Sequence, residues 1–253
     1  MNSSANTLEA LASLLANAKS AVAFTGAGVS TESGIPDFRS PGGVWSKYQT
    51  VYFDEFLRDP EARYEYWRQK AEAHVEFSAA QPNIAHQTLA KWESQNRLRG
   101  VITQNIDELH QIAGSKNVLE LHGTARKVMC LQCSARFDAD EMVRQFLAED
   151  RVPICPECGG NTKHATISFG QSLDPDVLRE SARWTNEADV FLAMGSSLVV
   201  EPAASLPRLA REHGAKLIIL NRDPTPLDSL ADIVIHDTLG STFRRLNELL
   251  EQD

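Results

Sequence analysis

Apolar and polar residues alternate along this chain in blocks that are typical of an α/β protein. Short, nearly continuous apolar runs predict buried strands at 21–25, 100–103, 119–121, 189–194, 215–220 and 233–235. Apolar residues three or four positions apart predict helices between them, at 6–18 (capped by Asn6), 82–95, 140–149, after Pro202, and at 242–250. Because buried strands that alternate with helices form parallel sheets covered on both faces, the chain is predicted to be α/β.

Two segments interrupt this regular pattern. Residues 41–81 are rich in aromatic residues with charges between them, and Asp59-Pro60-Glu61 predicts a helix start. These residues are predicted to form short helices that cover a cleft, although any single aromatic residue at helical spacing is more often part of a core. Residues 124–168 contain every cysteine of the chain.

A glycine-rich turn follows the first strand. Gly26-Ala27-Gly28 resembles part of a dinucleotide-binding fingerprint, in which glycines let the backbone approach a pyrophosphate. The match is incomplete, because Thr31 stands where the third glycine belongs and no acidic residue ends a second strand about 20 residues later. The pattern alone therefore leaves both nucleotide binding and an ordinary strand-to-helix turn open. Pro36-Asp37-Phe38-Arg39, just beyond, is more typical of a site loop than of a connector.

Polar or small residues follow each predicted strand. They include Gln104, Asn105 and Asp107, then His122, Gly195-Ser196-Ser197 and Asn221. Because the carboxyl ends of parallel strands meet at one edge of a sheet, these side chains are expected to converge there. Helix capping by Asn105 and Asp107, and a structural role for His122, are the alternatives.

The four cysteines form two Cys-x-x-Cys pairs, Cys130 with Cys133 and Cys155 with Cys158. Four thiolates at this spacing are typical of a zinc ribbon and would close a tetrahedral shell around one ion. Such a shell leaves no open position, so this zinc is expected to be structural. A dithiol redox pair is the alternative, which two matched pairs disfavour.

Composition and charge narrow the function further. The 253 residues are 42% hydrophobic and carry a formal net charge of −9, which disfavours tight nucleic-acid binding and is compatible with basic substrates. No apolar run approaches the roughly 18 residues that span a bilayer, and the first residues do not read as a secretory signal. A cytoplasmic enzyme is therefore expected.

Taken together, the motifs resemble those of the sirtuins, the NAD-dependent protein-lysine deacylases. The resemblance spans residues 21 to about 240 and is carried, in the family's order, by the glycine loop, Thr103-Gln104-Asn105-Ile106-Asp107, Leu121-His122-Gly123, both cysteine pairs, Phe169-Gly170, Gly195-Ser196-Ser197-Leu198 and Asn221. It implies a Rossmann-like NAD-binding domain made of residues 1–40, 82–123 and 169–253. It also implies a smaller domain, made of a helical module at 41–81 and a zinc-binding module at 124–168.

The resemblance also implies the reaction: an acyl-lysine protein reacts with NAD to give nicotinamide, O-acyl-ADP-ribose and free lysine. His122 would be the general base, and Asn105 and Asp107 would act on the nicotinamide end. The other implied NAD contacts are Gly26, Ala27, Gly28, Thr31, Ile35, Asp37, Phe38, Arg39, Trp45, Gln104, Ile106, Gly195, Ser196, Ser197, Asn221, Arg222, Asp223 and Leu239. The implied substrate contacts are Phe169, Gly170, Val199 and Val200.

Departures from the family pattern bear on the acyl group. Gln171 follows Phe169-Gly170 where many members have glutamate. Members specialised for succinyl-lysine carry Tyr-x-x-Arg in the helical module, whereas Trp67 follows Tyr64 at that spacing here. An acetyl or apolar acyl group is therefore favoured over succinyl.

Two other functions are weighed against deacylation. A mono-ADP-ribosyltransferase or NAD hydrolase would use the same pocket, but nicotinamide release alone does not require His122. A zinc-ribbon module on a nucleotide-sensing domain would not need Gln104, Asn105, Asp107 and His122 together. The sequence leaves the protein substrate and the oligomeric state open.

Overall fold

The computed structural model describes residues 2–37 and 48–251. A sheet of six parallel strands has the order β3-β2-β1-β7-β8-β9. Its strands are β1 (Ala21–Thr25), β2 (Gly100–Thr103), β3 (Val118–Glu120), β7 (Val190–Met194), β8 (Lys216–Leu220) and β9 (Ile233–Ile235). Every position of β1, β2 and β7 is buried, as expected for central strands covered on both faces. The predicted α/β fold with a parallel sheet is confirmed.

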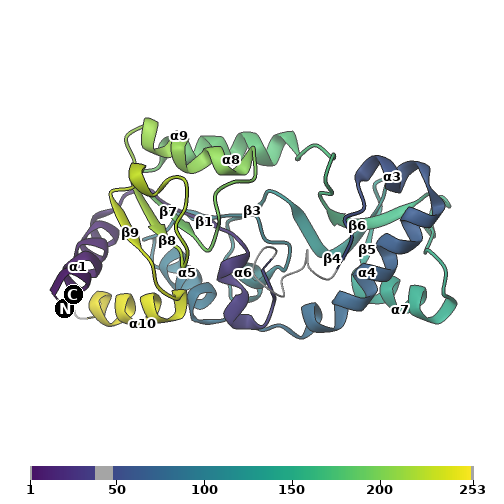
Figure 1. The fold of residues 1–253 in the computed structure, drawn as a ribbon, viewed down its shortest axis with the longest axis horizontal. Helices are drawn as coiled ribbons and strands as arrows, with labels where there is room; N and C mark the ends of the chain where they lie inside the picture. Colours follow the sequence, from purple (N-terminus) through teal and green to yellow (C-terminus); the bar gives the residue numbers. More distant parts are fainter. Residues whose placement is uncertain (1, 38–47, 252–253) are drawn as a thin grey trace.

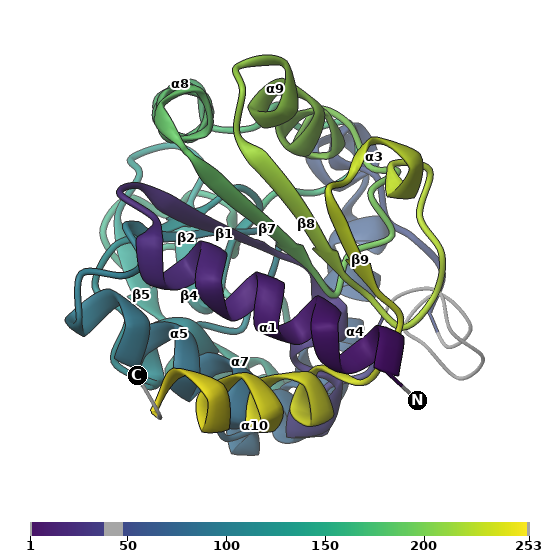
Figure 2. The ribbon, with the colours of Figure 1, turned by 90° about the vertical axis from the view of Figure 1, so that its left-hand side faces the viewer.

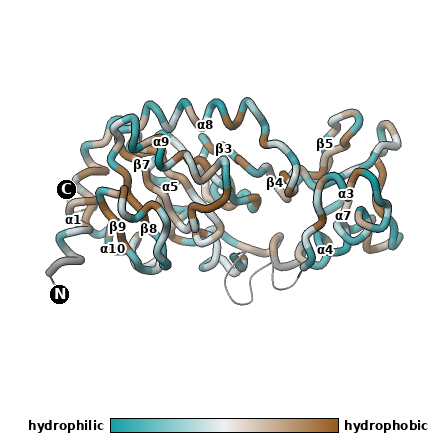
Figure 3. The backbone as a smooth tube through the Cα atoms, turned by 45° about the horizontal axis from the view of Figure 1, so that its top comes forward, coloured by the Kyte–Doolittle hydropathy of each residue, from teal (hydrophilic) through white to brown (hydrophobic). Residues whose placement is uncertain are grey.

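Helices cover both faces of this sheet (Figure 2). On one face lie α1 (Asn2–Asn17), α5 (Ile84–Ser94) and α10 (Leu239–Leu250), and on the other lie α8 (Pro175–Glu187) and α9 (Leu206–Glu212). Alternate residues of β1 serve the two cores, because Ala23 packs with the first set of helices and Phe24 with the second. In Figure 3, α8 alternates between hydrophilic and hydrophobic colours, as a helix on a sheet should.

A second sheet lies at the other end of the elongated molecule (Figure 1). It is antiparallel, in the order β5-β4-β6, with β4 (Gly123–Cys130), β5 (Arg136–Asp138) and β6 (Thr162–Thr166). We call this sheet and the helices α3 (Phe53–Arg58), α4 (Pro60–Ala79) and α7 (Ala139–Glu149) the small lobe, and the rest the large lobe. Phe56, Trp67 and Phe146 are buried in the small lobe's own hydrophobic core.

The remaining helical segments are short. They are α6 (Leu109–Ile112) and the 3₁₀ helices η1 (Ala27–Val29), η2 (Thr31–Ser33), η3 (Ala203–Ser205) and η4 (Asp228–Leu230). Within the described ranges, none of the helices is long and apolar enough to cross a membrane.

Some element boundaries differ from the sequence-based predictions. The first helix begins at Asn2, so the prediction that Asn6 caps it is wrong. Helix α8 and the small sheet were not predicted. The helical module holds one long helix, α4, where only short ones were expected. Its start is as predicted, since Asp59 accepts a 2.9 Å hydrogen bond from Glu61 N.

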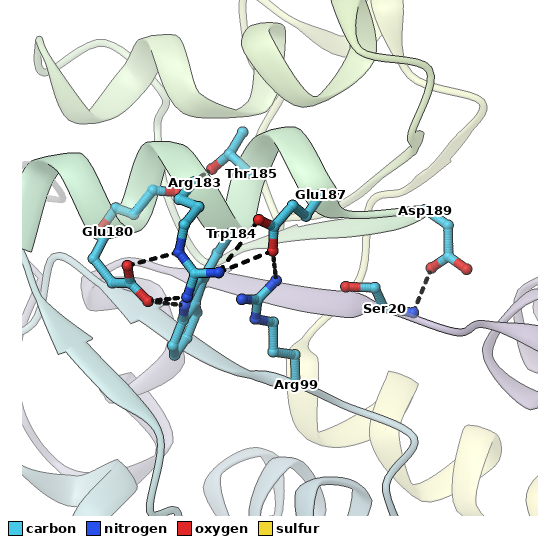
Figure 4. A network of polar contacts seen from close by, with 9 residues as sticks. Ser20, Arg99, Glu180, Arg183, Trp184, Thr185, Glu187 and Asp189 are labelled. Carbon is cyan, nitrogen blue, oxygen red and sulfur yellow. Dashed lines mark hydrogen bonds and ion pairs between the residues drawn. The ribbon is translucent and has the colours of Figure 1, made fainter.

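Polar contacts fasten α8 to the amino ends of the strands (Figure 4). The carboxylate of Asp189 accepts hydrogen bonds from Lys19 N at 2.6 Å and Ser20 N at 3.0 Å. Arg99 pairs with Glu187 at 2.6 Å, and its guanidinium lies 5.2 Å from the centroid of the Trp184 ring. This fastening is at the opposite ends of the strands from the site described next.

Candidate active site

A cavity of about 1030 Å³ runs along the carboxyl ends of the parallel strands and reaches the small lobe. Most described residues that the sequence singled out line it, namely Gly26, Ala27, Gly28, Thr31, Asp37, Gln104, Asn105, Ile106, His122, Phe169, Gly170, Gly195, Ser196, Ser197, Val200, Asn221, Arg222, Asp223 and Leu239. Ile35, Asp107 and Val199 are not among its lining residues. Phe38, Arg39 and Trp45 lie outside the described residues.

The glycine loop after β1 packs against the loop after β7. Gly28 N donates to Gly195 O at 2.8 Å, and a Cβ added at Gly28 would lie 2.8 Å from Gly195 Cα. Only glycine therefore allows this approach. Thr31, which replaces the fingerprint's third glycine, donates from Oγ1 to Gly28 O at 3.0 Å and closes the loop. The result is a backbone-lined cavity wall that an anionic group can approach.

Ser30 holds the polar residues that follow β2. Its Oγ donates to Asp107 Oδ2 at 2.6 Å and accepts from Asn105 Nδ2 at 3.1 Å. Asp107 also accepts from Leu109 N at 2.9 Å and is only 3% exposed. Asn105 thus lines the cavity, whereas Asp107 lies behind Asn105 and is connected to it through the hydroxyl of Ser30.

Two buried histidines, neither of which was singled out from the sequence, stand behind this network. His86 Nε2 lies 3.4 Å from Ser30 Oγ, and His110 Nε2 lies 2.9 Å from Thr25 Oγ1. The ring centroids are 4.8 Å apart. Burial lowers the pKa of His86 to about 4 and the pKa of His110 well below its ordinary value. Both rings are therefore neutral near pH 7 and act as fixed hydrogen-bonding groups.

His122 lies where the two lobes meet. Its Nδ1 is 3.0 Å from Gln104 O, and Gln104 Nε2 donates to Ser196 Oγ at 2.8 Å. Burial lowers the pKa of His122, and the hydrogen bond to Gln104 O opposes this shift in part. Ile167 N donates to the main-chain oxygen of His122 at 2.9 Å, so the chain leaving β6 runs beside the backbone of His122.

Exposed apolar side chains mark the mouth of the cavity. Phe169 is 47% exposed, and its ring centroid lies 6.1 Å from that of Tyr52, which is 50% exposed. Val199 is 52% exposed, and Val200 lines the cavity. Gln171 Oε1 accepts a 3.2 Å hydrogen bond from Ser168 N, so this side chain folds back on its own turn. The mouth therefore offers apolar surface to a ligand.

The helical part of the small lobe supplies a cavity wall, as a module that covers a cleft would, although its individual residues were not singled out from the sequence. Tyr66 and Lys70 line it, and Tyr66 Oη lies 3.3 Å from Thr166 Oγ1. Behind this wall, Lys163 is 1% exposed and donates from Nζ to Thr166 O and, at 3.3 Å, to His164 O. Burial, with a contribution from the charge of Lys70, lowers the pKa of Lys163 to about 7.

The four cysteine thiols gather at one point of the small lobe. Their Sγ atoms all lie within 4.8 Å of one another, with 3.5 Å between Cys130 and Cys158 and 3.7 Å between Cys133 and Cys155. Four sulfurs at tetrahedral Zn–S distances of about 2.3 Å lie about 3.8 Å apart. Backbone N–H groups of Cys133 and Gln132 point at Cys130 Sγ and lower the pKa of that thiol to about 6. The donor set therefore fits one structural zinc ion.

Comparison with known proteins identifies what this chain resembles. Residues 26–202 match the model of the Sir2 family. The NAD-dependent protein deacetylase of Rhodopseudomonas palustris is 45% identical over 238 residues, which cover 93% of this chain and 94% of that one. The protein of the same description from Thermodesulfovibrio yellowstonii is 42% identical over 232 residues, covering 92% and 91%.

Solved structures agree with these relatives. A Sir2 complex with a p53 peptide and NAD⁺ superimposes with a TM-score of 0.89 at 36% identity, covering 97% of this chain and 99% of that one. A Sir2 complex with a deacetylated p53 peptide and 3′-O-acetyl ADP-ribose also gives a TM-score of 0.89, at 37% identity and with 96% and 98% covered.

Proposed function

Because this chain belongs to the Sir2 family and is an NAD-dependent protein deacetylase, we propose that the cavity at its strand ends is where NAD and acyl-lysine react. The arrangement of His122 is the observation that carries this assignment. A half-buried imidazole with Nδ1 engaged by a carbonyl oxygen presents a neutral Nε2 to the cavity, as a general base requires.

The topology of the sheet indicates how NAD would lie. Strand order runs from β1 to β2 and β3 on one side, and from β7 to β8 and β9 on the other. The switch point between β1 and β7 is where open α/β sheets bind dinucleotides. Gly26, Gly28 and Ser196 line the cavity there and would hold the phosphates. With His122 beyond β3, the nicotinamide half belongs on the β2–β3 side and the adenosine half on the β8–β9 side.

Bound NAD supplies an electrophilic ribose carbon with nicotinamide as its leaving group. Asn105 would orient the nicotinamide end from the cavity wall, held by Ser30 and, behind it, by Asp107. His122 Nε2 would accept the proton of a ribose hydroxyl, which makes that oxygen a nucleophile. Gln104 keeps the imidazole in the tautomer that can do so.

The acyl-lysine would enter at the mouth of the cavity. Phe169 and Gly170 would flank the substrate on one side, and Val199 and Val200 on the other; the exposure of Phe169 and Val199 supports this. Main-chain pairing with an extended peptide would fix the substrate between these segments. Acetyl is the acyl group we favour.

NAD is the co-substrate, and the four-cysteine cluster can bind the structural zinc ion. We assign residues 1–40, 82–123 and 169–253 to the NAD-binding domain, and 41–81 and 124–168 to the small domain. The separate hydrophobic cores of the two lobes support this division. Four reduced thiols for zinc support a cytoplasmic location, and the net charge of −9 argues against nucleic acid as a partner.

Mass spectrometry of an acetyl-lysine peptide, with and without NAD, tests the assignment. We expect the peptide to lose its acetyl group only when NAD is present, with formation of an equal amount of acetyl-ADP-ribose. The His122→Ala variant should neither deacetylate the peptide nor form acetyl-ADP-ribose. Nicotinamide release should require the peptide. Release without peptide, or ADP-ribose attached to the peptide, would indicate the alternative NAD hydrolase or mono-ADP-ribosyltransferase.

A further inference from the structure

Glu32 joins the glycine loop to the first turn of α10. Its Oε1 accepts a 2.8 Å hydrogen bond from Gly240 N, and a Cβ added at Gly240 would collide with its Oε2. Glycine at 240 is thus what lets the carboxylate sit on this turn. Glu32 also lines the cavity, together with Thr238 and Leu239.

This end of the cavity is where the adenosine half of NAD would lie. The proposed function puts the reacting sugar beside His122 and the phosphates at Gly26–Gly28. The remaining half must then extend toward the loops after β8 and β9, which carry Asn221 and Leu239. Glu32 faces the cavity at that end.

The position of Glu32 bears on a gap in the sequence motif. In dinucleotide-binding folds, an acidic residue at the end of a second strand accepts a hydrogen bond from the ribose 2′-hydroxyl of NAD, whereas an arginine donates to the 2′-phosphate of NADP. In this chain the strand that follows β1 among the described strands is β2, and Gln104 follows it where the motif has an acidic residue. A carboxylate from another element can take this role, and Glu32 lines the cavity on the side opposite to Gln104 in the strand order.

Charge at this end favours the unphosphorylated cofactor. Three acidic residues, Glu32, Asp223 and Asp237, are among its lining residues. Arg222 is the cation among the described lining residues there, and its Nη2 lies 3.1 Å from Asp223 Oδ2. A 2′-phosphate would bring about two more negative charges into this surrounding.

We propose that Glu32 selects NAD over its 2′-phosphorylated form. The inference rests on the proposed function, because the function is what places adenosine next to Glu32. The carboxylate is exposed, so repulsion of the phosphate should weaken as salt is added. The hydrogen bond from Gly240 N holds the Glu32 carboxylate at this end of the cavity, where the adenosine half of the cofactor would lie.

Calorimetric binding of ADP-ribose and of 2′-phospho-ADP-ribose tests this without turnover. The variants are Glu32→Gln, which keeps an acceptor for Gly240 N, and Glu212→Gln, which removes an exposed charge at the end of α9 and away from the cavity lining. We expect the ratio of the two dissociation constants to fall about tenfold in Glu32→Gln and to stay unchanged in Glu212→Gln. The relative kcat/KM for NADP and NAD should shift in the same direction.

An unchanged ratio in Glu32→Gln, with ADP-ribose still bound, would overturn the inference and leave the proposed function intact. If the ratio of dissociation constants falls in Asp223→Asn and not in Glu32→Gln, the selection belongs to Asp223, and the inference about Glu32 is also overturned. Failure of the unaltered protein to bind ADP-ribose would contradict the proposed function itself. These outcomes separate the two claims.

Discussion

The Nδ1 atom of His122 lies 3.0 Å from the main-chain oxygen of Gln104. A carbonyl oxygen only accepts hydrogen bonds, so Nδ1 carries the hydrogen and the neutral ring leaves Nε2 bare. The side chain of Gln104 donates to Ser196 at the same time. One residue therefore orients the base and a hydroxyl of the phosphate-binding wall.

Replacing the base should separate nicotinamide release from deacetylation. We expect His122→Asn to lower kcat for deacetylation by roughly 10²–10⁴-fold, the usual contribution of a positioned base. Binding of ADP-ribose should remain within about twofold, because the glycine loop is untouched. Steady-state kinetics and calorimetry check this, and a variant with full deacetylase activity would exclude His122 as the base.

The acid side of the pH profile should reflect the burial of His122. A general base must be neutral, and burial lowers the pKa of this imidazole below its ordinary value of about 6.5. Activity is then retained as pH falls through 6.5 and is lost only at lower pH. The profile of kcat/KM for an acetyl-lysine peptide measures this, and a midpoint above 6.5 would contradict it.

Removing the Ser30 hydroxyl should disturb Asn105 and Asp107 together. Ser30→Ala leaves a buried carboxylate oxygen and a buried amide without their partner, which should lower the free energy of unfolding by about 1–3 kcal/mol. We also expect a fall in kcat with little change in KM for the peptide, because the mouth is unaltered. Denaturant unfolding and kinetics test this, with Ser94→Ala, in an exposed hydroxyl-to-carbonyl contact, as the control.

Metal analysis should find one zinc ion per chain. We expect a strong chelator to lower the midpoint of thermal unfolding and to abolish deacetylation, since the thiol cluster ties β4 to the loop before β6. Cys133→Ser and Cys158→Ser should each lower zinc content. Full activity in metal-free protein that remains folded would exclude a structural role for the ion.

Lys163 should make stability depend on pH. Its pKa is about 7 when folded and about 10.4 when unfolded, so between these values the unfolded chain binds one more proton. The free energy of unfolding should therefore rise with pH across this window, by up to about 1.4 kcal/mol per pH unit from this residue. Lys163→Met should remove that contribution and stabilise the protein at pH 7. Urea unfolding of both proteins from pH 6 to 10 measures the two effects. If the free energy of unfolding depends on pH in the same way in Lys163→Met and in the unaltered protein, the lowered pKa of Lys163 is contradicted.

Much of the site could be predicted from the sequence because the residues that follow parallel strands all lie at the same edge of the sheet. Gly26, Gln104, His122, Gly195 and Asn221 each follow an apolar run, and the parallel register brings all of them to one cavity. Periodicity cannot show which side chains turn inward. Asp107 looked like a cavity residue, yet the hydrogen bond from Ser30 holds it behind the wall.

Other features depend on contacts between distant residues. The strands of the small sheet are short and mix charged with apolar residues, so no apolar run reveals them. The start of helix α8 could have been predicted, because Asp174-Pro175 is a typical sequence for an N-cap followed by the first helical residue. In the structure Asp174 does cap the helix, and its side chain accepts a hydrogen bond from Asp176 N. Glu32 could not be recognised at all, since its partner Gly240 lies at the other end of the chain.

Strand β4 begins beside the base, at Gly123, and ends at a zinc ligand, Cys130. Its eight residues, whose register is irregular between Gly123 and Val128, span at most about 23 Å from the first Cα to the last. At the near end, a Cβ on Gly123 would strike Ala165 O, and the φ of +68° suits glycine, so the anchorage has no slack. A zinc ion at the cysteine cluster would thus be connected to the segment that carries the imidazole by a single strand, and its removal is expected to disturb the alignment of His122.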